Sequence, residues 1–505
     1  MSFFILLSLL VFGENKEFNE EIIYSLIFKS YDSKHLKSII KDTKKGIGGI
    51  HLLWGNYNIK DTQKLTSLIY SQSHNLPPFI AIDYEGGSVY LHQTHGLMNL
   101  PSNMAIGRSA DKSNTTTLFY LAGLELKKAG INMVFAPDVD VNTEIKNPII
   151  NIRAFSDNPQ SVYEMAKSVI TGLKAAGIIN TLKHFPGHGM VDNDPHLTLP
   201  QTYIDPIELY KTHIYPFRKL IEEKQADAIM VSHILYTQLD SHYPASMSDT
   251  VIKRILREQL NFDGLIITDS LDMKAISSHI SVENAALTAL KNGADMVLIG
   301  SYPTKKVIKR IKKAAENGEI DTNELIEKYE RIKRIKEKYN LKNFSLYHDD
   351  FDLAYKQVAE KISYASINIK KCKGISNIRF SKNLDLLLLL PERYLNDTIS
   401  LYSAVKEINS LTTIYTDLTK LPERNKEESS IIVIAYFWPY IADKKIDEIS
   451  KITKNYSYSV YINTLNPYDS LVLSDKFDCI IETFGINEFS MKAVSFKMKE
   501  LSFSN

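Results

Sequence analysis

Residues 178–189 of this 505-residue chain read IINTLKHFPGHG. The apolar start, Ile178 to Leu182, is typical of a buried strand, and it runs directly into Lys183 and His184. The proline and the glycines that follow shape a loop with a fixed backbone. Loops at strand ends on a rigid scaffold are where binding and catalysis concentrate. This stretch therefore indicates an enzyme whose site includes Lys183 and His184.

Further apolar runs of strand length are spaced along the first two thirds of the chain, with helical patterns between them. Near-continuous apolar strands that alternate with helices are typical of a parallel sheet covered by helices. Seven such units over about 300 residues predict an α/β fold of the (β/α)8 TIM-like barrel type, with one strand weak or missed. A doubly wound open sheet is the structural alternative. Besides 178–182, the runs are 47–53, 79–83, 132–136, 228–232, 264–268 and 294–299.

The pattern of strands and helices starts again after Leu341. We expect residues 17–342 to form the catalytic barrel and residues 350–505 to form a smaller C-terminal α/β sandwich domain. The runs that predict strands in this second domain are 384–390, 431–435, 459–463 and 479–482.

The N-terminus carries an apolar run at 3–12 that has the length of a signal peptide and is too short for a membrane span. No positively charged start precedes it, so a first strand or helix of the fold is the alternative. We predict residues 1–16 as a leader or signal segment. The chain is exported to the periplasm or cell envelope if residues 1–13 act as a signal, and cytoplasmic otherwise. No other segment is long and apolar enough for a stable membrane span.

The composition narrows the classes of function. Lys and Arg together number 60 against 59 for Asp and Glu, and this balance gives no electrostatic reason to expect nucleic acid as a partner. Cys372 and Cys479 cannot form a disulfide framework. We expect two buried thiols, because free cysteine is usually buried, with a single bridge as the alternative. We also expect a monomer.

Ionisable side chains stand at the ends of several predicted strands. They are Asp83, Asp138 with Asp140, His233 and Asp269. In a barrel all of these ends meet at the C-terminal face, where barrel enzymes place their sites. A single aspartate at a strand end is usually a helix cap, but several polar ends on one face indicate a site. For His233, a buried structural role is the equal alternative.

The segment Asp194-Pro195-His196 indicates proton transfer. Proline favours an extended conformation of the residue before it, which lets the Asp194 carboxylate reach Nδ1 of His196. A carboxylate there orients the ring and favours the imidazolium, so a general acid is available near neutral pH. A solvated loop pair is the structural alternative.

A metal site is the chemical alternative for this loop. Zinc or manganese ligands could come from His184, His188, His196, Asp192 and Asp194. Their spacing matches no compact metal motif, so we expect no metal and no other cofactor.

Four motifs, in this order along the chain, resemble glycoside hydrolase family 3, in its branch of bacterial β-N-acetylglucosaminidases. The resemblance covers about residues 45–340 and is specific, because separate motifs occur in order. The C-terminal part is similar only in outline. The motifs are DYEGG at 83–87, KHFPGHG at 183–189, DPH at 194–196 and FDGLIITDSLDMKA at 262–275.

The resemblance implies the catalytic residues. Asp269 matches the nucleophile, His196 matches the general acid/base, and Asp194 matches the partner that tunes it. A retaining glycosidase needs a carboxylate on one face of the anomeric carbon and an acid on the leaving-group side. Here a histidine would replace the second carboxyl group.

The resemblance also implies substrate contacts, which fall on Asp83, Arg153, Lys183 and His184. The chain departs from the family at Ser88 and Leu91, where the family usually carries arginines. The second of those arginines normally contacts substrate, so Leu91 bears on the identity of the sugar.

Together these implications predict a retaining exo-β-N-acetylglucosaminidase. It would hydrolyse terminal β-linked N-acetylglucosamine from small glycans such as peptidoglycan fragments. The alternative within the family is a β-glucosidase or a phosphorolytic relative, and the plain glucosidase branch takes its acid from the second domain. A barrel that binds sugar without cleaving it is the alternative outside catalysis.

Overall fold

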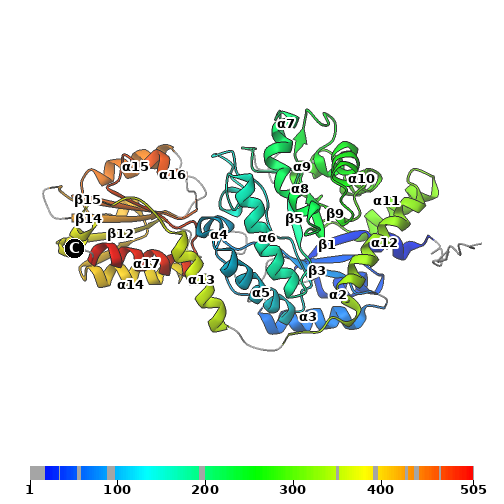
Figure 1. Ribbon diagram of the computed structural model, residues 1–505, viewed down its shortest axis with the longest axis horizontal. Helices are drawn as coiled ribbons and strands as arrows, with labels where there is room; N and C mark the ends of the chain where they lie inside the picture. The colour runs from blue at the N-terminus through cyan, green and yellow to red at the C-terminus, as the bar shows by residue number, and fades with distance from the viewer. Residues whose placement is uncertain are drawn as a thin grey trace, which may run out of the picture.

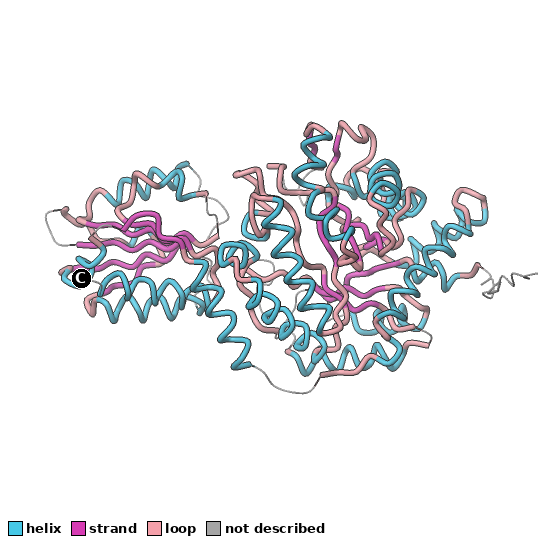
Figure 2. The backbone as a smooth tube through the Cα atoms, viewed as in Figure 1, coloured by secondary structure: helices cyan, strands magenta, loops and turns pink. Residues whose placement is uncertain are grey.

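A computed structural model of the chain shows two groups of strands, each covered by helices, arranged along the long axis of the molecule (Figures 1 and 2). The predicted leader, residues 1–16, lies outside the described residues, and so do Ser88 and Leu91. The structure describes residues 18–32, 35–53, 58–74, 76–87, 97–192, 199–347, 352–372, 374–389, 396–426, 430–436, 443–465 and 468–503.

Within the described part of the N-terminal half, eight strands run parallel in two sheets, of order β10-β1-β2-β3-β4 and β5-β7-β9. Single parallel bridges, Met133 with Ile179 and Ile267 with Met296, connect the edges of the two sheets. The strands are β1 (Ile27–Tyr31), β2 (Gly49–Leu52), β3 (Phe79–Ile82), β4 (Met133–Val134), β5 (Thr181–Phe185), β7 (Ala228–Val231), β9 (Leu265–Thr268) and β10 (Val297–Leu298).

Helices surround these strands and bury one large apolar core against them (Figure 1). No helix in the described ranges is long and apolar enough to cross a membrane. The main helices are α1 (Glu20–Ser25), α2 (Leu36–Lys44), α3 (Ile59–Gln72), α4 (Asn103–Ser109), α5 (Lys112–Lys128), α6 (Pro159–Ala175), α8 (Tyr215–Glu222), η6 (Thr250–Gln259), α10 (Val282–Lys291), α11 (Thr304–Glu316) and α12 (Thr322–Lys338).

The parallel α/β prediction is confirmed, with two corrections to the strands. The weak strand that the sequence left unassigned is β1, whose apolar pattern is interrupted by Lys29 and Ser30. The strand predicted at 178–182 is β5, which runs from Thr181 to Phe185. Lys183 and His184 therefore belong to the strand instead of following it. The strand can contain these two polar residues because both are buried beside polar partners.

The C-terminal half contains a six-stranded sheet among its described residues, in the order β11-β16-β15-β14-β12-β13. All its pairs are parallel except β11 with β16, and buried apolar clusters lie on both faces. The four predicted strands are confirmed, and β11 and β13 are additional. The elements are α13 (Asp352–Ser366), β11 (Asn368–Cys372), β12 (Asn383–Leu389), α14 (Ile399–Ile408), β13 (Thr412–Tyr415), β14 (Ser430–Tyr436), α15 (Asp443–Thr453), β15 (Tyr458–Asn463), α16 (Asp469–Leu473), β16 (Cys479–Glu482) and α17 (Glu488–Phe503).

The two halves contact each other through loops of both. The Ser102 hydroxyl donates a hydrogen bond to the Phe484 carbonyl oxygen, and Asn487 donates to the Leu100 carbonyl oxygen at 2.9 Å. Met104 and Ile152 of the N-terminal half pack into an apolar core of the C-terminal sheet. The predicted boundaries at 342 and 350 stay predictions.

The expectation of two buried thiols is wrong, because Cys372 and Cys479 form a disulfide. The two residues pair directly across the antiparallel strands β11 and β16. The sequence could not show this, because 107 residues separate the two cysteines and β11 was not recognised as a strand.

Replacing both cysteines by serine should lower the stability of the chain by about 2–4 kcal/mol, because the bridge closes a long loop in the unfolded state. We expect a lower melting temperature for C372S/C479S than for the wild type in differential scanning calorimetry. Dithiothreitol should lower the wild-type melting temperature and leave that of the double variant unchanged. A wild-type melting temperature that does not respond to reductant would contradict the bridge.

Candidate active site

A cavity of about 490 Å³ opens at the carboxyl ends of the parallel strands of the N-terminal half. Five of the seven residues expected in the site line this one cavity: Asp83, Arg153, Lys183, His184 and Asp269. The other two, Asp194 and His196, lie outside the described residues. Side chains up to 186 positions apart in the sequence thus line one cavity. They meet there because the carboxyl ends of the parallel strands lie on the same side of the sheets.

Lys183 and His184 both line the cavity although they are neighbours in β5. In a regular strand, consecutive side chains point to opposite faces. The pairing of β5 with β7 shifts register between Leu182 and Phe185, and such an irregularity re-aims side chains. The shift explains how both residues reach one site.

A buried cluster of charges forms the floor of the cavity. The Lys183 ammonium donates to Asp83 Oδ1 at 2.8 Å and also pairs with Glu85 Oε1. The Arg153 guanidinium holds Glu85 with two hydrogen bonds, of 2.8 Å from Nε and 2.9 Å from Nη2. Two cations and two carboxylates therefore balance each other, and Glu85 and Lys183 are almost completely buried.

The cluster keeps its carboxylates ionised. Burial opposes ionisation of Asp83, but the charge of Lys183 and the hydrogen bond from His51 hold its pKa well below the usual range. Burial likewise opposes ionisation of Glu85, and Arg153 and Lys183 lower its pKa. A ligand entering the cavity would therefore meet a charged hydrogen-bond acceptor in Asp83.

Asp140 fixes the orientation of His184. Its Oδ2 lies 2.8 Å from Nδ1 of His184, and its Oδ1 accepts the backbone N–H of His188 at 2.6 Å. Arg153 Nη2, which can only donate, lies 3.3 Å from His184 Nε2. These partners assign the proton of a neutral His184 to Nδ1.

Asp138, Asp140 and His184 stand close enough to hold a metal ion, with ligand atoms within 4.8 Å of one another. The surroundings do not suit a cation. The Arg153 guanidinium already lies 3.6 Å from Asp138, and Asp140 is occupied by donors from His184 and His188. Burial and the charge of Asp140 raise the pKa of Asp138 well above its usual value, which favours its protonated form.

Asp269 directly follows β9 and lines the same cavity. Its Oδ1 accepts the Ser270 backbone N–H at 2.7 Å. Burial opposes its ionisation, but His233, His184 and this N–H lower its pKa below the usual value. An ionised, partly exposed carboxylate at this place can attack an electrophilic carbon.

His233 has the structural role that the sequence left open. Its Nε2 donates to the Ser270 carbonyl oxygen at 2.9 Å, and its Nδ1 lies 2.7 Å from Ser246 Oγ. The ring is buried and does not line the cavity. It holds the backbone that carries Asp269.

The glycines of the KHFPGHG loop are required by close packing. Gly187 has a φ of 139°, and a Cβ there would lie 2.6 Å from His213 Cβ. A Cβ on Gly189 would collide with the Val141 carbonyl oxygen. The loop thereby places His188 against the cavity, where burial lowers the pKa of its ring to about 4. A neutral, buried His188 suits an architectural role in this loop.

Three residues of the site had no predicted role, namely His51, Glu85 and Asp140. His51 lies within β2, with Nε2 at 3.1 Å from Asp83 Oδ2 and Nδ1 at 2.9 Å from Ser30 Oγ. In the sequence, the position of His51 inside an apolar strand was the available signal, because a buried histidine needs a hydrogen-bond partner. Asp140 was recognised as a strand-end carboxylate, and Glu85 as part of a motif, without a role for either.

Residues 19–335 match the profile of the glycosyl hydrolase family 3 N terminal domain. Beta-hexosaminidase A of Pseudoalteromonas piscicida is 31% identical over 386 residues, which cover 71% of this chain and 64% of that relative. The beta-hexosaminidase of Tolumonas auensis is 34% identical over 256 residues, which cover 50% of this chain and 75% of that relative. The chain thus spans about two thirds of the length of the first relative.

Two solved structures have the same fold over nearly the whole chain. A glycoside hydrolase family 3 beta-N-acetylglucosaminidase from Paenibacillus sp. has a TM-score of 0.84 at 23% identity and covers 96% of each chain. Beta-glucoside phosphorylase BglX has a TM-score of 0.84 at 21% identity, covering 96% of this chain and 92% of that one. At these identities the likeness concerns the fold, and it does not separate the two activities.

Replacing Glu85 by glutamine should destabilise the chain by about 3–5 kcal/mol, because it leaves Lys183 and Arg153 buried with one carboxylate too few. The measurement is the melting temperature and the midpoint of urea unfolding. Glu319→Gln is the matched control, since Glu319 forms a two-bond pair with Arg310 at the surface. That change should have little effect on either measurement, because ion pairs at the surface contribute little to stability. Equal losses in the two variants would refute the buried charge cluster.

Proposed function

Because the chain belongs to glycosyl hydrolase family 3, we propose that it is a retaining exo-β-N-acetylglucosaminidase. It removes terminal β-linked N-acetylglucosamine from small glycans. The beta-hexosaminidases of Pseudoalteromonas piscicida and Tolumonas auensis, at 31% and 34% identity, support this activity. The observation that carries the proposal is the ionised Asp269 carboxylate in the same cavity as four polar side chains suited to a sugar.

In this mechanism Asp269 is the nucleophile. Its carboxylate oxygen attacks the anomeric carbon while the bond to the departing glycosidic oxygen breaks, which gives a covalent glycosyl-enzyme. Water then displaces Asp269 from the same carbon and regenerates the carboxylate. The low pKa of Asp269 suits both steps, because attack requires the ionised form and a weakly basic carboxylate leaves readily.

His196 supplies the proton in the proposed first step, and Asp194 orients its ring. The imidazolium protonates the departing oxygen, and the neutral ring then removes a proton from the attacking water. These roles rest on the Asp194-Pro195-His196 motif alone, since both residues lie outside the described part of the chain. The site offers no competing acid in His188 or His233, because burial lowers the pKa of both rings.

The charged cluster provides directional contacts for sugar hydroxyls. Two of the three ammonium N–H groups of Lys183 are used by Asp83 and Glu85, which leaves one for a ligand. Four of the five N–H groups of Arg153 donate to Glu85, His184 and the Ile149 carbonyl oxygen. A hydroxyl can therefore donate to Asp83 and accept from Lys183 or Arg153.

The finer architecture is part of the proposal. The bridges at both edges of the two parallel sheets support a closed (β/α)8 barrel over residues 17–342. The mixed sheet with helices on both faces supports a separate α/β sandwich domain over residues 350–505. Disulfides persist mainly in oxidising compartments, so the Cys372–Cys479 bridge supports the exported alternative, and with it peptidoglycan fragments as substrates.

The alternatives within the family are a β-glucosidase or a phosphorolytic enzyme. The plain glucosidase branch takes its acid from the second domain, and none of the described residues of the C-terminal half lines the cavity. A sugar-binding barrel without catalysis would need neither Asp269 nor the Asp194–His196 pair. Comparing an aryl β-N-acetylglucosaminide with the matching aryl β-glucoside, each with and without phosphate, separates these activities.

Replacing Asp269 by asparagine should lower kcat/KM for an aryl β-N-acetylglucosaminide by about 10³-fold or more, because the amide is not a nucleophile. Asp249→Asn, at an exposed aspartate outside the cavity, is the matched control and should keep wild-type activity. Turnover by D269N close to that of the wild type would overturn the assignment.

Replacing His196 by alanine should slow the hydrolysis of aryl glycosides to a degree that depends on how much the leaving group needs protonation. A phenyl glycoside needs protonation and should lose about 10²–10⁴-fold in the glycosylation step, whereas a dinitrophenyl glycoside should lose much less there. The neighbouring Asp192→Ala is the control, because Asp192 is exposed. An H196A variant that slows glycosylation of both substrates equally would refute a role in proton donation.

A further inference from the structure

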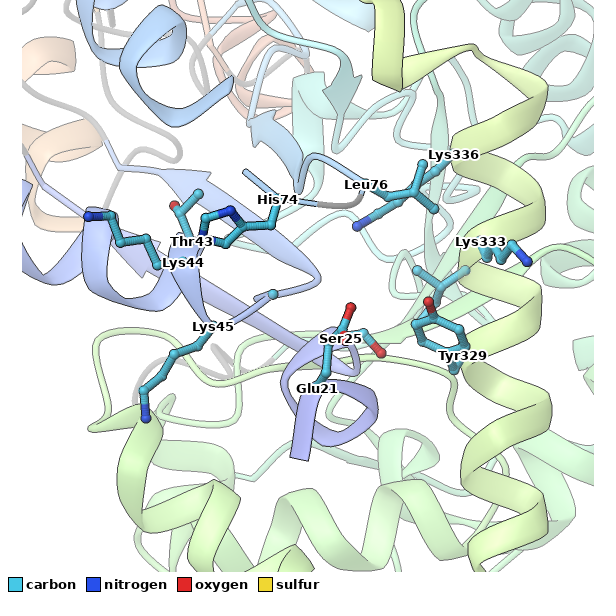
Figure 3. A pocket seen from close by; sticks show the side chains of 12 residues that line it. Glu21, Ser25, Thr43, Lys44, Lys45, His74, Leu76, Tyr329, Lys333 and Lys336 are labelled. Carbon is cyan, nitrogen blue, oxygen red and sulfur yellow. The ribbon is translucent and has the colours of Figure 1, made fainter. Parts of the chain in front are cut away.

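A second cavity, of about 210 Å³, lies at the opposite ends of the strands (Figure 3). Ser25 precedes β1, Gly46 precedes β2 and Leu76 precedes β3, and the helix α12 closes the remaining side. None of the residues that line it also lines the candidate active site. The proposed glycosidase mechanism therefore has no use for this cavity.

Lys336 of α12 is the unusual residue of this cavity. Only 3% of its surface is exposed, and Figure 3 shows its side chain reaching into the space with the ammonium toward the interior. Among the described residues, no carboxylate and no hydrogen-bond acceptor contacts this ammonium. The ammonium lies over the face of Phe79, whose ring centroid is 5.0 Å from Nζ.

An ammonium in this position is costly for the fold. Removing a charge from water without a partner carries a large penalty, and a contact with an aromatic face offsets only part of it. Burial accordingly lowers the pKa of Lys336 to about 7. An apolar side chain of similar length would fill the same space without the penalty, so the fold alone gives no reason for a lysine here.

The walls of the cavity are positive. Glu21 is the one carboxylate among the lining residues that the structure describes, against Lys44, Lys45, Lys333 and Lys336. Figure 3 shows the ammonium groups of Lys44 and Lys45 directed away from the interior, and Lys45 Nζ lies 3.9 Å from Glu20 Oε1. The remaining ionisable groups at the wall are His74 and Tyr329.

We propose that this cavity is a binding site for a small oxyanion, a phosphate or a short carboxylate, with Lys336 as its counterion. The anion supplies the missing partner for the buried ammonium, and charge-assisted hydrogen bonds of this kind are the strong ones. A cavity of about 210 Å³ is suited to a small ion.

The test measures binding to the full chain without any glycoside, so its result does not depend on the proposed enzymatic activity. Thermal unfolding is followed at pH 7 during titration with inorganic phosphate or succinate, at constant ionic strength set with chloride. We expect a saturable rise in the wild-type melting temperature. A response to phosphate alone identifies a phosphate ligand, and a response to succinate alone identifies a carboxylate.

Lys336→Met removes the counterion and keeps the volume of the side chain. It should melt at or above the wild-type temperature without anion and should lose the response to anion. Lys313→Met is the control, at an exposed position of α11 outside the cavity, and should keep the response. Absence of saturable binding of both anions to the wild type, or an unchanged response in K336M, would overturn the proposal.

Discussion

The Lys183 ammonium, held between the carboxylates of Asp83 and Glu85, is the interaction on which the site depends. A charge buried this deeply is tolerated only when its partners are fixed around it. Asp83 and Glu85 come from the end of β3, Lys183 from β5, and Arg153 from a short 3-10 helix far along the chain. The parallel register of the sheets brings these ends together, and the charge balance makes any other arrangement costly.

The same constraint explains the neighbouring side chains. His51 and Asp140 each complete the hydrogen bonding of a charged or polar residue that faces the cavity. The polar layer beneath the cavity is held in place for this reason. Asp269 lines the same cavity, and among the described residues its carboxylate is held by one hydrogen bond, of 2.7 Å, from the Ser270 backbone N–H. A rigid binding layer facing a less constrained carboxylate suits a site in which one group binds and the other reacts.

The sequence predicted the parallel strands from local apolar patterns. It predicted the convergence of Asp83, Lys183, His184 and Asp269 from motifs at strand ends, and Arg153 was added by the family resemblance. It did not predict β1, since Lys29 and Ser30 interrupt its apolar pattern. The roles of His51 and Asp140 depend on contacts between distant strands, which no local pattern contains. The disulfide depends on the antiparallel pairing of β11 with β16, and that pairing is likewise a property of the tertiary structure.

The described residues of the C-terminal half support the site without lining it. Asn142, two residues after Asp140, donates to the hydroxyl of Tyr468 at 3.1 Å, so one loop of the site rests on the other half of the chain.

The central claim, that Asp269 forms a covalent bond with the sugar, is tested most directly by trapping that intermediate. An activated 5-fluoro β-N-acetylglucosaminide should leave one fluorosugar on the peptide that contains Asp269, as read by tandem mass spectrometry. Attachment to another residue, or release of the α-anomer as the first product of an unmodified substrate, would contradict the account.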